Sequence, residues 1–252
     1  MSPKTYPRLA SLVALLFLLF PGSSGVSAEP LAVEPRASEI LAAALTHLAG
    51  TTSLTLRAEV ISETTLSSGE KLQYPGTLEI ALRRPDRLSY KLESEQRRVA
   101  AWYDGKSFAL LDSEKNVCAT TPAPSSLGLL FDDMAARLGF RPPLSVLLGE
   151  DSASAIPKRI ESGFYVGRGV VGGVACHHLA FRQQNVDVQL WVAAEGAPVI
   201  KRIVITQKKL PAAPQLSYTI VSWDFAAVLG DAVFVFEPPR DVVLCDFQSL
   251  AK

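Results

Sequence analysis

The sequence is poor in cysteine and histidine, which limits the sites that it can build. Its 252 residues include three cysteines and three histidines. Cys118, Cys176 and Cys245 are too far apart for a disulfide-stapled miniprotein or a CxxC metal knuckle. Cys118 and Cys245 both fall in predicted strands, and a disulfide between them is one alternative. The favoured interpretation is that the cysteines are free, buried thiols. We therefore expect no metal site and no cofactor.

Neither sign of charge is in excess, which argues against a nucleic-acid partner. The chain has 25 Lys and Arg against 25 Asp and Glu, a formal net charge of zero at pH 7. Nucleic-acid binding depends on basic side chains that neutralise phosphates. We therefore expect no nucleic acid among the partners.

The apolar run at the N-terminus is short for a membrane span, which needs about 20 residues. Two basic residues precede this run, from residue 9 to residue 20, and small residues follow it up to Ala28. These three parts are typical of a secretory signal peptide. We expect residues 1–28 to be cleaved after about Ala28 and residues 29–252 to form a single periplasmic domain. A retained N-terminal anchor is the less favoured alternative.

Motifs of established enzymes are missing or misplaced. There is no Gly-x-Ser-x-Gly elbow and no helix-borne His-Glu pair. Residues 167–172 match the dinucleotide-binding Gly-x-Gly-x-x-Gly, but that loop needs a helix after it, and here a predicted strand follows. On a strand, Cys176 and His178 share a face and His177 points away, so the two histidines cannot ligate one ion together. We expect a protein without catalytic residues; a hydrolase or metal enzyme around Cys176 and His178 is less favoured.

Hydrophobic periodicity indicates one helix followed by a long series of hairpins. Apolar residues recur at spacings of three and four from Pro35 to Leu48, and Gly50 follows as a stop. From Ser53 the period changes to two, and turns such as Asp104-Gly105 separate alternating segments. The predicted strands lie near residues 53–60, 78–83, 88–93, 99–103, 107–111, 116–121, 163–171, 174–182, 186–192, 199–207 and 216–225, with shorter pieces at 233–236 and 242–247.

A helical insertion interrupts the hairpins between residues 122 and 157. Its apolar residues recur at helical spacing from Leu127 to Leu138, with Gly139 as a C-cap, and a short apolar stretch follows at 144–148. An amphipathic segment of this size must pack on the sheet or cover one end of it. We therefore expect a mainly β fold with a helical lid (α+β), whose large curved antiparallel sheet has about 11 strands and is open or closed.

Several motifs carry a resemblance to a known superfamily. Leu82-Arg83-Arg84-Pro85-Asp86-Arg87-Leu88, Trp102-Tyr103-Asp104-Gly105-Lys106-Ser107-Phe108 and Asp112-x-x-x-Asn116 are similar to the front half of the LolA-type lipoprotein carriers. Tyr103-Asp104-Gly105-Lys106, Tyr165-Val166-Gly167, Gly173-Val174-x-Cys176-His177-His178-Leu179-Ala180-Phe181-Arg182 and Gln189-Leu190-Trp191 look more closely like a family of predicted periplasmic proteins of unknown function within that superfamily. The likeness covers about residues 35–247.

The resemblance implies an unclosed β-barrel with a helical lid, whose interior accepts acyl chains in characterised relatives. It also implies a role for Arg84, which falls where the carriers place an arginine before proline that helps to hold the lid. The stretch around Cys176 and His178 belongs to the uncharacterised family and carries no known chemistry. Because fold does not fix function, the ligand stays open at this point.

We expect a non-catalytic periplasmic binding protein that holds an acyl chain, a lipid or a lipoprotein-like apolar ligand between sheet and lid. The residues expected to line this apolar pocket are Leu54, Leu56, Leu78, Ile80, Leu82, Leu127, Leu130, Phe131 and Met134. The alternative is an envelope sensor or interaction module with a transient protein partner. That alternative predicts a filled interior and an exposed apolar patch or sheet edge.

Overall fold

The computed structural model describes residues 32–247, so the predicted signal peptide lies outside the described residues. The helices are α1 (Pro35–Ala49), α2 (Leu127–Leu138), α3 (Ser145–Leu148), α4 (Ser152–Lys158) and the 3-10 helix η1 (Asp231–Phe234). The strands are β1 (Ser53–Thr65), β2 (Lys71–Arg83), β3 (Arg87–Ser94), β4 (Arg98–Tyr103), β5 (Ser107–Asp112), β6 (Val117–Pro122), β7 (Ile160–Val171), β8 (Val174–Gln183), β9 (Val186–Ala193), β10 (Ile200–Gln207), β11 (Gln215–Asp224) and β12 (Val243–Leu244). None of the helices in this part of the chain is long and apolar enough to cross a membrane.

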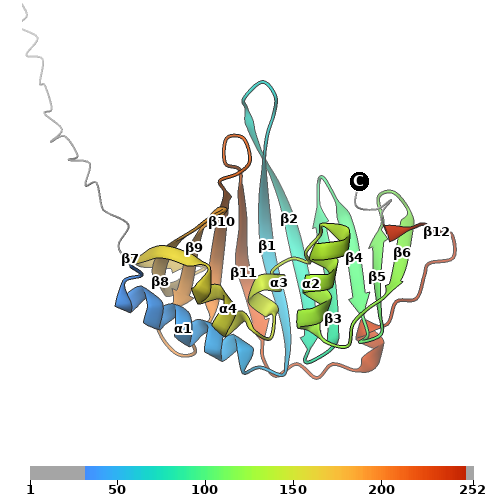
Figure 1. The fold of residues 1–252 in the computed structure, drawn as a ribbon, viewed down its shortest axis with the longest axis horizontal. Helices are drawn as coiled ribbons and strands as arrows, with labels where there is room; N and C mark the ends of the chain where they lie inside the picture. The colour runs from blue at the N-terminus through green and yellow to red at the C-terminus, as the bar shows by residue number, and fades with distance from the viewer. Residues whose placement is uncertain (1–31, 248–252) are drawn as a thin grey trace, which may run out of the picture.

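All strands belong to one unclosed sheet in the order β12-β6-β5-β4-β3-β2-β1-β11-β10-β9-β8-β7. Each neighbour pairs antiparallel except β12, which lies parallel to β6 at the edge. The predicted fold, a large curved antiparallel sheet that is mainly β, is confirmed (Figure 1).

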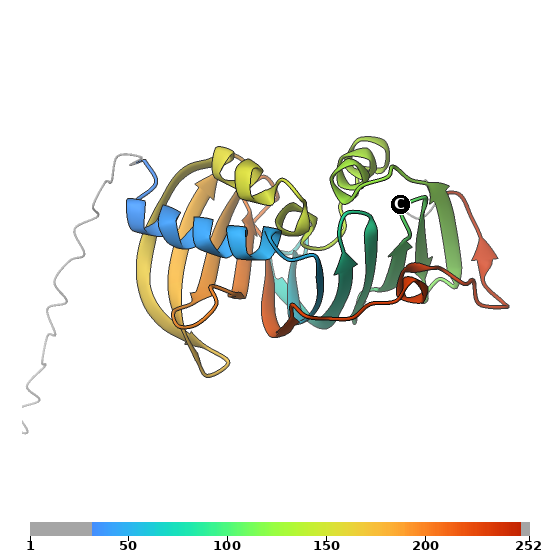
Figure 2. The same cartoon turned by 90° about the horizontal axis from the view of Figure 1, so that it is seen from below.

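The sheet consists of two meanders joined at its centre by the pairing of β1 with β11. As a result, β6 and β7 lie far apart although they are consecutive strands: β7 forms one edge of the sheet, and β6 lies next to β12 at the other edge. The connection between them, which contains α2, α3 and α4, must therefore cross the whole sheet. It does so on the concave side, where α1 also lies (Figure 2).

The main core lies between the concave face of the sheet and these helices. Alternate residues of β1 and β2, among them Leu54 and Ile80, point into it and are almost completely buried. The buried face of α1 contains Leu41, Leu45 and Leu48, as its 3.6-residue period requires. Local signals set the ends of α2: Ser126 caps its first turn and Gly139 ends it with a φ of 62°.

The C-terminal segment differs from the sequence prediction. Residues 233–236 were expected as a short strand, but Asp231–Phe234 forms a 3-10 helix, and only Val243–Leu244 pairs with the sheet. Phe234 is buried and Phe236 packs on Trp102 at 4.9 Å between ring centroids. The segment crosses the convex face of several strands, so it has no strand to pair with along its length (Figure 2).

Truncating a buried leucine of β2 should destabilise the fold far more than truncating an exposed leucine near the other end of the same strand. Leu78 is fully buried, whereas Leu72, on the same face of β2, is 39% exposed in the hairpin that rises above the core. We expect Leu78→Ala to lower the free energy of unfolding by about 2–5 kcal/mol and Leu72→Ala by about 0.5 kcal/mol. Urea unfolding followed by circular dichroism measures both; equal losses would contradict this packing.

Candidate functional site

A pocket lies between the concave face of β8–β11 and the helices α1, α3 and α4, which we call the lid. The three lid helices contact one another, and α1 also contacts β7, β8 and β9. The floor of this lid pocket is apolar and consists of Val188, Leu190, Ile203, Ile205, Leu216 and Tyr218. Its roof includes Leu41, Leu45, Leu144, Val146, Leu147 and Ile156.

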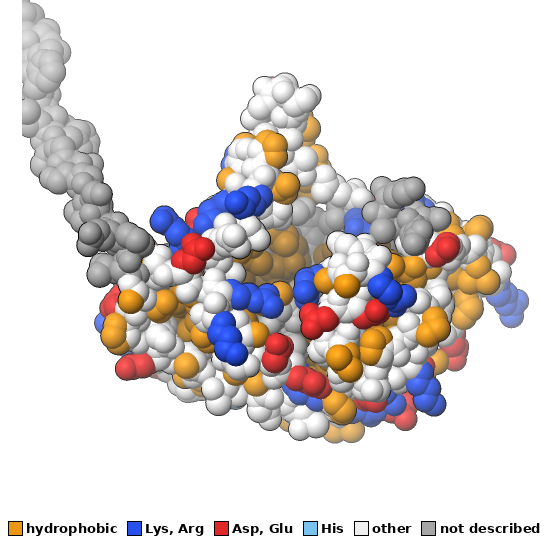
Figure 3. Space-filling model, viewed as in Figure 1, with side chains coloured by type: hydrophobic (Ala, Val, Ile, Leu, Met, Phe, Trp, Pro, Cys, Tyr) orange, Lys and Arg blue, Asp and Glu red, His pale blue; other side chains and the backbone are white. Residues whose placement is uncertain are grey.

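The lid pocket has a volume of about 740 Å³. Sites for small molecules in proteins have about 300–1,000 Å³ and mostly apolar linings, so both its size and its lining suit an apolar ligand. Figure 3 shows the hollow from outside: apolar side chains lie deep inside it, and Lys and Arg side chains border its opening.

The nine residues that the sequence predicts as pocket lining lie elsewhere. Each is at most 3% exposed, and all belong to one buried cluster. They come from three elements, with Leu54 and Leu56 on β1, Leu78, Ile80 and Leu82 on β2, and Leu127, Leu130, Phe131 and Met134 on α2. None of them lines the lid pocket. The structure places them in the packed half of the interior, which the buried residues of α2 and the inward residues of β1 and β2 form together.

Side-chain size explains why one half is packed and the other hollow. The helix α2 contributes three leucines, Phe131 and Met134 to the concave side, whereas α4 has the sequence Ser-Ala-Ser-Ala-Ile-Pro-Lys. Only Ile156 of α4 offers a large apolar side chain, and it lines the pocket. The small residues of α4 are therefore a sequence signal for the pocket that strand periodicity does not contain.

Arg84, the predicted lid-holding residue, follows the end of β2 and binds the lid through backbone carbonyls. Its Nη1 donates to the Leu148 carbonyl at the end of α3, at 2.7 Å. Its Nε donates to the carbonyl of Thr51 at 3.0 Å, and its Nη2 reaches the carbonyl of Leu48 in α1 at 3.5 Å. Burial lowers the pKa of the Arg84 guanidinium, and the nearby charge of Glu150 opposes this shift. One side chain thus links the sheet to two lid helices.

Arg83, the preceding residue, binds the C-terminal segment on the opposite, convex face of the sheet. Its Nη1 donates to the carbonyl of Leu229 at 2.7 Å, and its Nη2 contacts the Asp231 carboxylate. Its guanidinium also lies 5.4 Å from the ring centroid of Phe234. Adjacent arginines therefore fasten the lid on the concave side and the C-terminal segment on the convex side.

Leu144, at the start of α3, has a backbone conformation that leucine rarely adopts. Its φ is 56°, in the left-handed region, where a side chain other than glycine costs about 1–2 kcal/mol. Leu144 also lines the lid pocket. Such strain concentrates at binding sites and hinges, which fits the position of Leu144 in the lid.

The residues around Cys176 are arranged for packing. Cys176 is fully buried, and desolvation raises the pKa of its thiol, which disfavours the reactive thiolate. His178 stacks on Trp191 at 4.0 Å between ring centroids, and its Nε2 lies 3.0 Å from Oε1 of Gln189. Residues 32–247 contain no group of three or more side chains placed to hold a metal ion.

The other two cysteines, Cys118 and Cys245, lie next to each other at the β12 edge of the sheet. Cys245 donates its backbone N–H to the Cys118 carbonyl at 2.9 Å, next to the pairing of Leu244 with Cys118. Cys245 follows β12 and packs against the main core. Burial raises the pKa of the Cys118 thiol, and the nearby Cys245 thiol adds to this rise. All three cysteines are free thiols.

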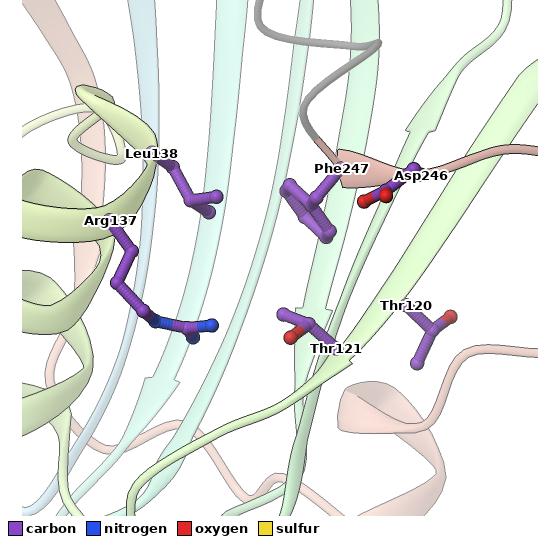
Figure 4. Close-up of a pocket in the computed structure, with 6 residues that line it drawn as sticks. All are labelled: Thr120, Thr121, Arg137, Leu138, Asp246 and Phe247. Carbon is purple, nitrogen blue, oxygen red and sulfur yellow. The ribbon is translucent and has the colours of Figure 1, made fainter.

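A second, smaller hollow of about 330 Å³ lies at the other half of the molecule. Figure 4 shows its walls: Thr120 and Thr121 from β6, Arg137 and Leu138 from the end of α2, and Asp246 and Phe247 near the C-terminus. The Arg137 side chain is held by Asp133 one turn earlier in α2. With its smaller volume and polar walls, this hollow suits an apolar ligand less well than the lid pocket does.

Replacing Arg84 should loosen the lid, whereas replacing Arg83 should loosen the C-terminal segment. A lysine keeps the charge, but its single nitrogen cannot replace the three separate nitrogens with which Arg84 reaches the carbonyls of Thr51, Leu148 and Leu48. We expect Arg84→Lys to destabilise the protein by about 1–3 kcal/mol and to speed amide exchange in α3. The matched variant Arg83→Lys should instead speed exchange around Leu229–Phe234. Hydrogen-exchange mass spectrometry measures both, and unchanged exchange in α3 of Arg84→Lys would contradict the role of Arg84.

Comparison with known proteins gives a family match and distant structural similarities. Residues 37–248 match the model of the family described as "Predicted periplasmic protein (DUF2092)". A comparison with curated proteins finds no match.

The structure is similar to several solved structures at low identity. An uncharacterized conserved protein from Thermus thermophilus is 12% identical, with 84% of this chain and 99% of that chain covered and a TM-score of 0.48. The lipoprotein LppX of Mycobacterium tuberculosis is 10% identical, with 78% and 98% covered and a TM-score of 0.41. A LolA superfamily protein from Nitrosomonas europaea is 12% identical, with 79% and 97% covered and a TM-score of 0.38.

The family match covers most of the chain and agrees with the periplasmic location that the N-terminal sequence predicts. The chain therefore belongs to the DUF2092 family of predicted periplasmic proteins.

Proposed function

We propose that this protein is a non-catalytic periplasmic binding protein that holds an acyl chain or a similar apolar ligand in the lid pocket. The observation that carries the proposal is the pocket of about 740 Å³ with an apolar floor and an apolar roof. The buried thiol of Cys176 and the stacked ring of His178 fit structural roles. The proposed ligand class includes free lipids and the acyl chains of lipoproteins.

The hydrophobic effect would drive binding. Transfer of apolar surface out of water contributes about 25 cal/mol per Å², or about 0.8 kcal/mol for each buried methylene. A chain of a dozen methylenes would gain up to about 10 kcal/mol before the costs of ordering the ligand and the lid. That gain allows micromolar binding after substantial entropic losses.

The position of Arg84 supports a lid that opens. Arg84 holds α1 and α3 through hydrogen bonds to carbonyls rather than through an apolar contact. Such bonds can be exchanged for hydrogen bonds to water when the lid opens, and an apolar chain in the pocket would cover the apolar roof and floor that opening exposes. Lid opening would give a long acyl chain access to the floor of the pocket.

A second candidate function, as an interaction module, is supported by the edge strand β7. Phe164, Val166 and Val170 are 46–73% exposed along this edge. An exposed apolar edge can pair with a strand of another protein. This function would use a different surface from the lid pocket, so the two are compatible.

Filling part of the lid pocket should weaken the binding of an apolar chain. Val188 is a half-buried residue of the pocket floor, whereas Val221 is 59% exposed and lines no part of the pocket. We expect Val188→Trp to weaken the binding of oleyl alcohol at least tenfold, because the indole occupies the space of the chain, and Val221→Trp to leave it unchanged. Isothermal titration calorimetry measures the affinity, and thermal unfolding verifies that both variants fold.

Two outcomes would overturn the proposal. One is that the unaltered protein binds no oleyl alcohol and that native mass spectrometry finds no acyl species bound after purification. The other is that a folded Val188→Trp variant binds oleyl alcohol as tightly as the unaltered protein does.

A further inference from the structure

The opening of the lid pocket carries more positive than negative charge. Lys158 ends α4, Arg159 follows it, and Arg141 precedes α3; the one carboxylate of the lining is Glu161 in β7. All four side chains belong to exposed residues. Two of the cations therefore come from the junction between the lid and the first strand of its half of the sheet.

These cations differ in whether they already have a partner. Arg141 pairs with Asp132 at 3.4 Å. No ion pair in the described part of the chain includes Lys158 or Arg159. Both lie at the C-terminal end of α4, where a cation interacts favourably with the helix dipole. Because α4 has only seven residues, this interaction is weak, and both side chains remain exposed to solvent.

Polarity changes sharply from the opening of the pocket to its floor. The turn between β8 and β9 adds Gln184 and Asn185 to the exposed, polar opening. The floor, in contrast, holds Leu190 and Ile203, which are 6% and 4% exposed. A ligand that satisfies both regions has an apolar chain at one end and a negatively charged group at the other.

From this arrangement we infer that the lid pocket selects amphiphiles with an anionic headgroup, a carboxylate or a phosphate, over neutral ones. The inference rests on the proposed function and specifies its ligand class. The chain lies on the floor under the lid, and the headgroup remains at the opening beside Lys158 and Arg159. Charge pairs that stay partly exposed are weak individually, so we expect selectivity of roughly three- to tenfold rather than an absolute requirement.

The test compares ligands that share a chain and differ in headgroup charge. Titration calorimetry at pH 7.5 gives the affinity of the full chain for oleate and for oleyl alcohol. We expect oleate to bind roughly three- to tenfold more tightly in low salt and this ratio to fall in 0.5 M NaCl, because salt screens exposed charges. Lysophosphatidic acid and lysophosphatidylcholine, both with an oleoyl chain, form a second pair that tests a phosphate as the charged group.

A double variant assigns the selectivity to the two cations. Lys158→Ala with Arg159→Ala should bring the ratio of oleate to oleyl alcohol affinity close to one. The control, Arg97→Ala with Arg98→Ala, changes the net charge equally at exposed positions that do not line the pocket, and it should keep the ratio. Thermal unfolding verifies that both double variants are folded.

The outcomes separate this inference from the proposed function. If neither oleate nor oleyl alcohol binds, the proposed function fails and the inference fails with it. If both bind with equal affinity, or if the control lowers the ratio as much as the Lys158 and Arg159 variant does, the pocket holds apolar chains but does not select their charge. Selectivity within the phosphate pair alone would identify a phospholipid headgroup, and selectivity within the carboxylate pair alone a fatty acid.

Discussion

The pairing of β1 with β11 at the centre of the sheet is the constraint on which the rest of the structure depends. It joins two meanders into one sheet and places β6 and β7 far apart in it. The chain between these two strands must then cross from one side of the sheet to the other. Because this connection is amphipathic and the sheet is curved, it crosses on the concave side and buries its apolar residues there. The lid is thus a consequence of strand order.

The concave side is divided into two parts with different properties. Under α2, large side chains such as Phe131 and Met134 fill the interior, and the inward residues of β1 and β2 are almost inaccessible. Under α4, serine and alanine leave space above β8–β11, and the lid pocket results. The packed half supplies the burial that stabilises the fold, which allows the other half to remain hollow. Stability and the proposed ligand binding therefore depend on different parts of one sheet.

Arg83 and Arg84 connect the sheet to the segments that cover its two faces. Successive residues at the end of β2 reach opposite faces, one toward the C-terminal segment and the other toward the ends of α1 and α3. Both use charge-assisted hydrogen bonds to carbonyls, which are directional and stronger than neutral ones. The lid is thereby held at its inner end, close to the centre of the sheet. The cationic residues Lys158 and Arg159 lie at the opening of the pocket instead.

The sequence by itself determined the elements. Period-two alternation and the turn residues defined the hairpins from Ser53 onward, and helical spacing with the signals at Ser126 and Gly139 defined α2. These are local properties, because a side chain's face and a helix cap depend on neighbours along the chain. Only the tertiary structure decided where the hollow lies. Sequence periodicity shows that a leucine points to the concave face of the sheet, but it does not show what covers that face. The same alternation therefore occurs where Phe131 of α2 fills the interior and where the space below α4 is empty. The strand-like residues 233–236 do not form a strand for a similar reason: they cross the sheet with no strand beside them, and the first two belong to the 3-10 helix Asp231–Phe234.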